Sequence, residues 1–156
     1  MRKVPVELQS WKEFFRARVE IAAVYLFGSL GTEFEHPQSD IDLGVVFTRP
    51  VTLSEELELD GALSLHIGHD RIDLVNLNRS PIALQFRALR EGMLLYEGDY
   101  VKHSDFIECV IKAYPDYAVK YAVFARDYEL ALKEEYSHGG SSKRAVGNPQ
   151  YICRSC

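Results

Sequence analysis

YLFGSLGTEFEHPQSDIDLGVVF, residues 25–47, places two aspartates inside an apolar segment that otherwise has the composition of a β-strand. A strand directs alternate side chains to the same face, so Asp40 and Asp42 are predicted to lie together. Ile41 and Leu43 then point into the core on the other face. Two carboxylates roughly 6–7 Å apart along a strand repel each other unless a cation lies between them. The segment therefore predicts a cation site.

The composition is that of an ordinary globular protein. The chain has 156 residues, 47% hydrophobic and 26% charged, which suits one compact domain. No apolar stretch is long enough to predict a membrane span, and no membrane association is expected. Three cysteines are too few for a disulfide framework, so a cytoplasmic location is expected.

The charge balance bears on possible partners. The net charge is −5, and three basic residues after Glu135 leave the rest of the chain more acidic still. This argues against direct bulk binding of nucleic acid through a basic face. It does not exclude a nucleotide substrate, because bound cations can supply the positive charge.

Strands and helices alternate along the chain, which predicts the α/β (α+β) class. The expected strands are residues 21–27, 40–47, 71–77 and a short edge strand at 92–98. The expected helices are residues 5–19, 54–67, 81–91 and 104–135, the last either one helix or a pair broken near Pro115. In the second helix Ser54 is expected near the N-cap, and Gly68 is expected to end it in the left-handed conformation.

The chain is expected to form one domain, residues 1–136, with the helical segment 104–135 packing on it or on a partner. The tyrosine-rich stripe at 114–128 is expected mostly in the core, with some of it available to a partner. Residues 137–156 are rich in Gly, Ser and basic residues and are expected to form a mobile tail.

A third acid, Asp73, interrupts the apolar run at 71–77. Each unpaired ionised carboxylate costs several kcal/mol to desolvate, so three of them on two strands need a common explanation. Mg²⁺ prefers oxygen ligands, and three acids can hold two ions roughly 3.5–4 Å apart, which supports phosphoryl displacement. For Asp73 the alternative is an ion pair with Arg71.

A Gly-Ser pair, Gly28 and Ser29, follows the first expected strand. Glycine lets backbone N–H groups approach a phosphate, and a serine hydroxyl adds a donor. The pair alone is a weak signal. Combined with Asp-x-Asp ten residues later and a third acid in a later strand, it is a strong one.

These motifs resemble the nucleotidyltransferase superfamily related to DNA polymerase beta, whose signature is Gly-Ser followed by Asp-x-Asp in apolar surroundings. The segments GSLGTEFEHPQSDIDLGVVF (28–47) and DRIDLVNLNRSPIALQFRALREGMLLYEGD (70–99), with the helical end, resemble its minimal members, the MNT family. The resemblance spans roughly residues 20–135. It implies a nucleotidyltransferase fold, a small mixed sheet flanked by helices with a helical C-terminal part.

The resemblance also implies roles for the site residues. Gly28 and Ser29 would contact the nucleotide triphosphate, and Asp40 and Asp42 would bind both Mg²⁺ ions. Asp73 would complete one metal site and help deprotonate the acceptor hydroxyl. ATP would be the substrate.

The family resemblance implies a partner as well. Minimal members pair with a HEPN-family toxin, act as its antitoxin, and transfer AMP to a toxin tyrosine, so a hetero-oligomer is expected. Where relatives often have glycine this chain has Glu33, after Thr32, which adds negative charge near the phosphates. Three alternatives stay open: a catalytically weak antitoxin that neutralises by binding, an aminoglycoside-type nucleotidyltransferase acting on a small molecule, and a metal-dependent nuclease. The last would not explain the Gly-Ser pair.

Overall fold

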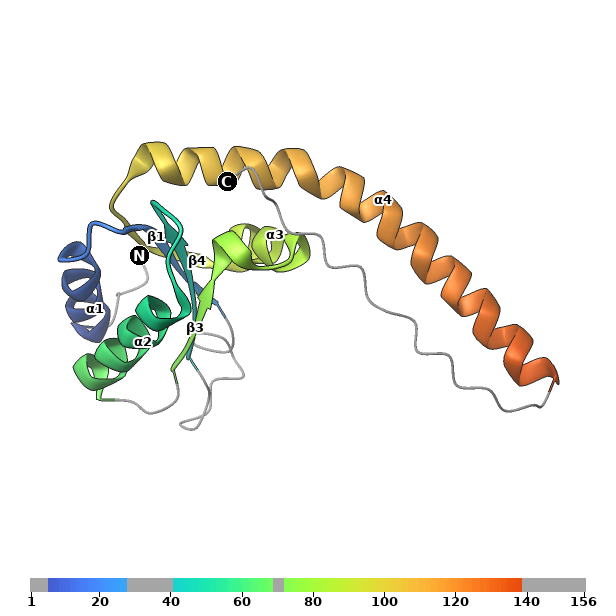
Figure 1. Ribbon diagram of the computed structural model, residues 1–156, viewed down its shortest axis with the longest axis horizontal. Coiled ribbons are helices and arrows are strands. Elements are labelled where there is room, and N and C mark those ends of the chain that lie inside the picture. The colour runs from blue at the N-terminus through green and yellow to red at the C-terminus, as the bar shows by residue number, and fades with distance from the viewer. Residues whose placement is uncertain (1–5, 28–40, 69–71, 139–156) are drawn as a thin grey trace.

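The computed structural model describes residues 6–27, 41–68 and 72–138, and within them four strands form one mixed sheet (Figure 1). The strands are β1 (Ile21–Phe27), β2 (Ile41–Phe47), β3 (Ile72–Asn76) and β4 (Met93–Glu97), in the order β3-β2-β1-β4. β1 pairs antiparallel with β2 and β4, and β2 pairs parallel with β3. The predicted mixed sheet is confirmed, and β4 is an edge strand as expected.

Helices cover both faces of this sheet (Figure 1). They are α1 (Val6–Arg16), α2 (Leu53–Ile67), α3 (Ile82–Glu91) and α4 (Tyr100–His138), with a short 3-10 helix, η1 (Leu77–Arg79), after β3. α1 and α2 pack on one face, and α3 and the first part of α4 pack on the other. The remainder of α4 extends beyond the sheet and α3.

Each face of the sheet has its own core. On the α1/α2 face, Trp11 and Phe15 pack with Leu59 and Leu63 against alternate strand residues. The α3/α4 face buries a second set, Ala22, Ala23, Tyr25, Val46, Leu77, Ile82, Ala88, Phe106 and Val110. Strand side chains alternate between the two faces of the sheet. A strand residue whose two neighbours pack against α1 and α2 therefore points to the α3/α4 face.

One expectation about the helices needs correction. The N-cap of α2 is Thr52 and not Ser54: Thr52 Oγ1 accepts a hydrogen bond from Glu55 N at 3.3 Å, and Glu55 Oε2 accepts one from Thr52 N at 2.7 Å. This reciprocal pair satisfies two backbone donors at the helix start. Gly68 ends α2 with φ 70°, as predicted.

The structure decides between the two alternatives left open for the long helical segment. It is one helix, α4, which runs from Tyr100 to His138 with Pro115 inside it. It is therefore not a pair broken near the proline, and it continues past the expected boundary at 136. The rest of the predicted tail, residues 139–156, lies outside the described residues.

A chain of three polar side chains fixes the start of α4 to the sheet. His103 is 3% exposed; its Nε2 lies 2.5 Å from the Tyr25 hydroxyl, and its Nδ1 lies 2.5 Å from Glu97 Oε1. A carboxylate only accepts, so Nδ1–H donates to Glu97 and Nε2 accepts from Tyr25. The contacts join β1, β4 and α4.

No helix within the described residues is long and apolar enough to cross a membrane. The cytoplasmic location stays a prediction.

Gly44 of β2 is predicted to be intolerant of a side chain. A Cβ there would lie 2.8 Å from Leu77 Cδ1 and 2.8 Å from Phe27 Cε1, both in the packed α3/α4 face. Gly44→Ala is expected to lower the free energy of unfolding by about 1–3 kcal/mol in urea denaturation. Gly61→Ala is the matched control, since nothing lies within 4 Å of its added Cβ, and it is expected to raise stability by up to about 1 kcal/mol. Equal stability of Gly44→Ala and wild type would contradict this packing.

Tyr25 is predicted to make stability fall at high pH. Burial, and secondly the negative charge of Glu97, raise the pKa of Tyr25 from 10.0 to about 12. A pKa that is higher in the folded state stabilises fully below the unfolded value, and this stabilisation is lost as pH rises from about 10 to about 12. Urea unfolding across this range is expected to show a shallower decline for Tyr25→Phe than for wild type. Tyr100→Phe, at an exposed tyrosine, is expected to keep the wild-type slope; identical slopes in all three proteins would refute the assignment.

Candidate active site

Asp42 and Asp73 lie side by side on neighbouring strands. They are partners in the register of the parallel pair β2–β3, and partnered strand residues direct their side chains to the same face. Their flanking residues Ile41, Leu43 and Ile72 belong to the α1/α2 core. Both aspartates therefore point to the opposite face, the one covered farther along the strands by α3 and α4.

The other expected site residues, Gly28, Ser29 and Asp40, lie outside the described residues. The described chain leads directly to them, because Phe27, the residue before Gly28, is the register partner of Asp42 on the other side of β2. Of the five, the structure thus brings together Asp42 and Asp73. Arg71, the alternative partner of Asp73, is also outside the described residues.

The environment of the two carboxylates differs. Asp42 is half-buried in the middle of the sheet, whereas Asp73 is exposed on the edge strand β3. Neighbouring strands are about 5 Å apart, and at that distance two negative charges near a protein surface repel by about 1–3 kcal/mol. A cation bound between them would remove this repulsion and gain oxygen ligands.

A further acid, Asp60 of α2, increases the negative charge near β3. Its Oδ1 is buried and has no hydrogen-bond partner among the described residues. Burial raises the pKa of Asp60, and the negative charge of Asp73 raises it further. The sequence analysis did not single out this residue, although it follows Glu56 by four positions and so lies on the same side of α2.

Side-chain hydrogen bonds hold β3 in place beside β2. Asn76, at the end of β3, donates from Nδ2 to Glu56 Oε1 of α2 at 2.6 Å. Asn78 bridges to the end of β2: its Oδ1 accepts from Phe47 N at 2.8 Å and its Nδ2 donates to Phe47 O at 3.3 Å. These contacts extend a short parallel pairing and so help to keep Asp42 opposite Asp73.

The described residues alone do not form a complete metal site. Among them no group of three His, Cys, Asp or Glu side chains is placed to hold an ion. The pair nevertheless fits a divalent cation chemically, because it offers carboxylate oxygens, which Mg²⁺ prefers, on two neighbouring strands. Asp40, two residues before Asp42, is the residue expected to complete the set.

A cavity of about 370 Å³ lies elsewhere in the fold. Its lining includes Arg18, Glu20, Phe47, Glu55 and Glu58. Phe47 ends β2, whereas Asp42 is near the start of that strand, so the cavity is at the opposite end of the sheet and contributes nothing to the carboxylate pair.

The family is established by sequence. The family described as "Polymerase beta, Nucleotidyltransferase" matches residues 9–100, more than half of the chain, and includes both described aspartates. The chain belongs to this family and is thereby a nucleotidyltransferase. No curated protein matches the chain significantly.

Solved structures share the fold. One chain of a toxin–antitoxin crystal structure with AMP-PNP is 22% identical, with a TM-score of 0.66, covering 78% of this chain and 98% of that one. A chain from the complex of tri-AMPylated Shewanella oneidensis HEPN toxin with MNT antitoxin is 20% identical, with a TM-score of 0.63, covering 80% and 97%. A chain of the MntA–HepT toxin–antitoxin structure is 20% identical, with a TM-score of 0.63, covering 81% and 99%. At such identities the likeness establishes the fold.

Magnesium is predicted to stabilise the protein through this carboxylate pair. In thermal unfolding, millimolar Mg²⁺ is expected to raise the midpoint of the wild type, because it binds the folded site and relieves the repulsion. Asp42→Asn and Asp73→Asn are expected to lose most of that increase. Asp105→Asn, at an exposed acid of α4, is the control. A full Mg²⁺ response in the Asp73→Asn protein would show that the ion binds elsewhere.

Proposed function

We propose that this chain is a Mg²⁺-dependent nucleotidyltransferase that transfers AMP from ATP to a hydroxyl, expected to be a tyrosine, of a partner HEPN-family toxin, and so acts as its antitoxin. The observation that carries the proposal is the register pairing of Asp42 with Asp73 inside a domain of the nucleotidyltransferase family. The likeness to chains from toxin–antitoxin complexes, one containing AMP-PNP and one an AMPylated toxin, supports the nucleotide and the partner.

Each site residue has a role in this reaction. Asp40 and Asp42 would hold Mg²⁺, and Asp73 would complete the site for one of two ions. Gly28 and Ser29 offer donors to the triphosphate. When bound, the cations supply positive charge to the phosphates and lower the pKa of the attacking hydroxyl.

The chemistry is a substitution at phosphorus. The acceptor oxygen forms a bond to the α-phosphorus of ATP, and the bond from that phosphorus to the oxygen bridging to the β-phosphate breaks. The products are the AMP ester and pyrophosphate. Asp73, exposed at the sheet edge, takes the hydroxyl proton, since it is the described site carboxylate most accessible to a large acceptor.

A second function has specific support, namely neutralisation of the toxin by binding alone. Glu33 adds negative charge to the segment between Gly-Ser and Asp-x-Asp. In addition, the second half of α4 exposes apolar side chains that a partner could cover. The small-molecule alternative has no comparable support in the structure.

AMP transfer is predicted to depend on the aspartates. Incubation with ATP, Mg²⁺ and the proposed HEPN-family partner is expected to raise the partner's mass by one AMP unit or more. Asp42→Asn and Asp73→Asn are each expected to slow this at least about 100-fold, because several kcal/mol of charge stabilisation is lost. Asp105→Asn is expected to react at the wild-type rate.

The two functions are separated in cells. If the Asp40→Asn, Asp42→Asn double variant protects cells against the toxin as well as wild type does, neutralisation is by binding. Wild-type transfer rates in the single variants would instead refute the site assignment.

A further inference from the structure

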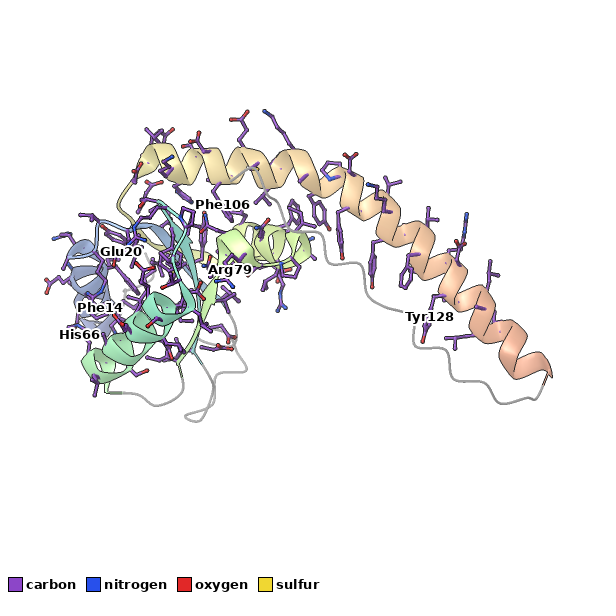
Figure 2. The ribbon with its side chains drawn as sticks, viewed as in Figure 1. Phe14, Glu20, His66, Arg79, Phe106 and Tyr128 are labelled. Carbon is purple, nitrogen blue, oxygen red and sulfur yellow. The ribbon has the colours of Figure 1, made fainter. Side chains whose placement is uncertain are left out.

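Five aromatic side chains form one row along α4. They are Tyr114, Tyr117, Tyr121, Phe124 and Tyr128, which we call the aromatic seam. Their spacing of three, four, three and four residues places them on a single face of the helix, as in the contact row of a coiled coil. Figure 2 shows Tyr128 on the same side of α4 as Phe106, which packs in the core.

The seam begins inside the folded body. Phe86 of α3 stacks on Tyr114 with ring centroids 3.7 Å apart and planes at 7°, and Tyr114 lies 6.1 Å from Tyr117. Phe106 and Val110 continue the same row toward the start of α4 and are buried against the α3/α4 face. In this part of α4 the aromatic row therefore packs against another helix, α3.

The seam then continues past the elements that cover it. Tyr121 is 49% exposed and Tyr128 is 47% exposed. The rings contact each other, Tyr117 with Tyr121 at 5.8 Å and Phe124 with Tyr128 at 6.2 Å. Among the described residues, no other helix or strand packs against this part of α4, so the prediction that the stripe is mostly core is wrong beyond Tyr117.

The composition around the seam indicates a protein helix as the occupant. Acidic and basic residues are mixed along this half of α4, as in Lys120, Arg126, Asp127 and Glu129, so it presents no one-signed field for a nucleic acid. A large aromatic side chain can bury about 150–250 Å² in all. The half-exposed rings therefore still have apolar surface to bury, and this surface would supply a substantial part of the roughly 800 Å² that each partner contributes to a stable interface.

A second copy of this chain is the less suitable occupant. Two copies meeting through the seam would set a row of rings against the same row of rings, whereas well-packed helices place large side chains opposite small ones. The seam also lies on the α3/α4 side of the sheet, the side to which Asp42 and Asp73 point. A protein docked there is on the same side of the sheet as the carboxylates.

We propose that the aromatic seam is the docking surface for a helix of the protein substrate, a helix that presents small and aliphatic side chains to it. The proposal rests on the proposed function, because the docked protein is the one that receives AMP. It adds the surface and the kind of partner element, and it assigns binding and chemistry to separate groups of residues.

The test compares two triple variants of the full chain. The seam variant carries Tyr121→Ala, Phe124→Ala and Tyr128→Ala. The control carries Val119→Ala, Val123→Ala and Leu130→Ala, which removes exposed apolar side chains of the same helix on the opposite face. Alanine favours helix in both variants, and circular dichroism checks that α4 is retained.

Binding to the proposed HEPN-family partner is measured by titration calorimetry without ATP. The seam variant is expected to raise Kd at least about 30-fold, as loss of central aromatic anchors does, and the control less than about threefold. In the transfer assay the seam variant is expected to raise the KM for the partner, keep kcat at saturating partner, and keep the thermal response to Mg²⁺ and ATP.

The outcomes are distinguishable from failure of the proposed function. Loss of binding in the seam variant supports docking even if the wild type binds its partner but transfers no AMP, a result that would refute only the transfer. Unchanged binding in the seam variant, equal loss in the control, or no binding by the wild type would overturn the proposal. A wild-type dimer that the seam variant converts to monomer, in sedimentation of the chain alone, would instead assign the seam to a second copy.

Discussion

The parallel pairing of β2 with β3 is the constraint on which the site depends. A slip of one residue in this pairing would turn Asp73 to the opposite face. It would also take Ile72 out of the α1/α2 core, where it is 9% exposed, and burial of such a side chain contributes about 1.5–3 kcal/mol. The contact of Asn76 with Glu56 and the bridge from Asn78 to Phe47 would be lost as well. Apolar packing and polar side chains thus favour the same register.

That register brings like charges together, and the fold tolerates this because its apolar layers carry the stability. The sequence alone predicted the clustering of Asp42 with Asp73, since an acid in a buried strand must point away from its apolar neighbours. It did not predict Asp60, because that residue is one of four acids in the second expected helix, and only the packing of α2 on β3 brings it close to Asp73. The contributions of Gly28, Ser29 and Asp40 stay predictions, as these residues lie outside the described parts of the chain.

The elements themselves were largely predictable, because short apolar runs ended by turns identify the strands and periodic apolar positions identify the helices. The errors fall where two local signals compete. Both Thr52 and Ser54 can cap a helix, and Thr52 does so because Glu55 is three residues after it and completes the reciprocal pair. The sequence left open whether α4 is continuous, because a proline in a helix interior costs about 3 kcal/mol although the apolar spacing continues past Pro115.

Pro115 also affects the shape of α4. By helical spacing it lies nearly opposite Tyr117, on the face away from the seam. A proline ring clashes with the carbonyl four residues before it and bends a helix away from the proline side. Pro115 therefore bends α4 toward the seam, and Figure 1 shows α4 curving as it extends past α3, with the inner side of the curve facing α3. α4 is anchored at His103 and covered by α3 as far as Tyr114, and beyond that it curves toward its aromatic face. A helix curved in this way encloses part of a partner's surface. A straight helix would contact the same surface only along a single line.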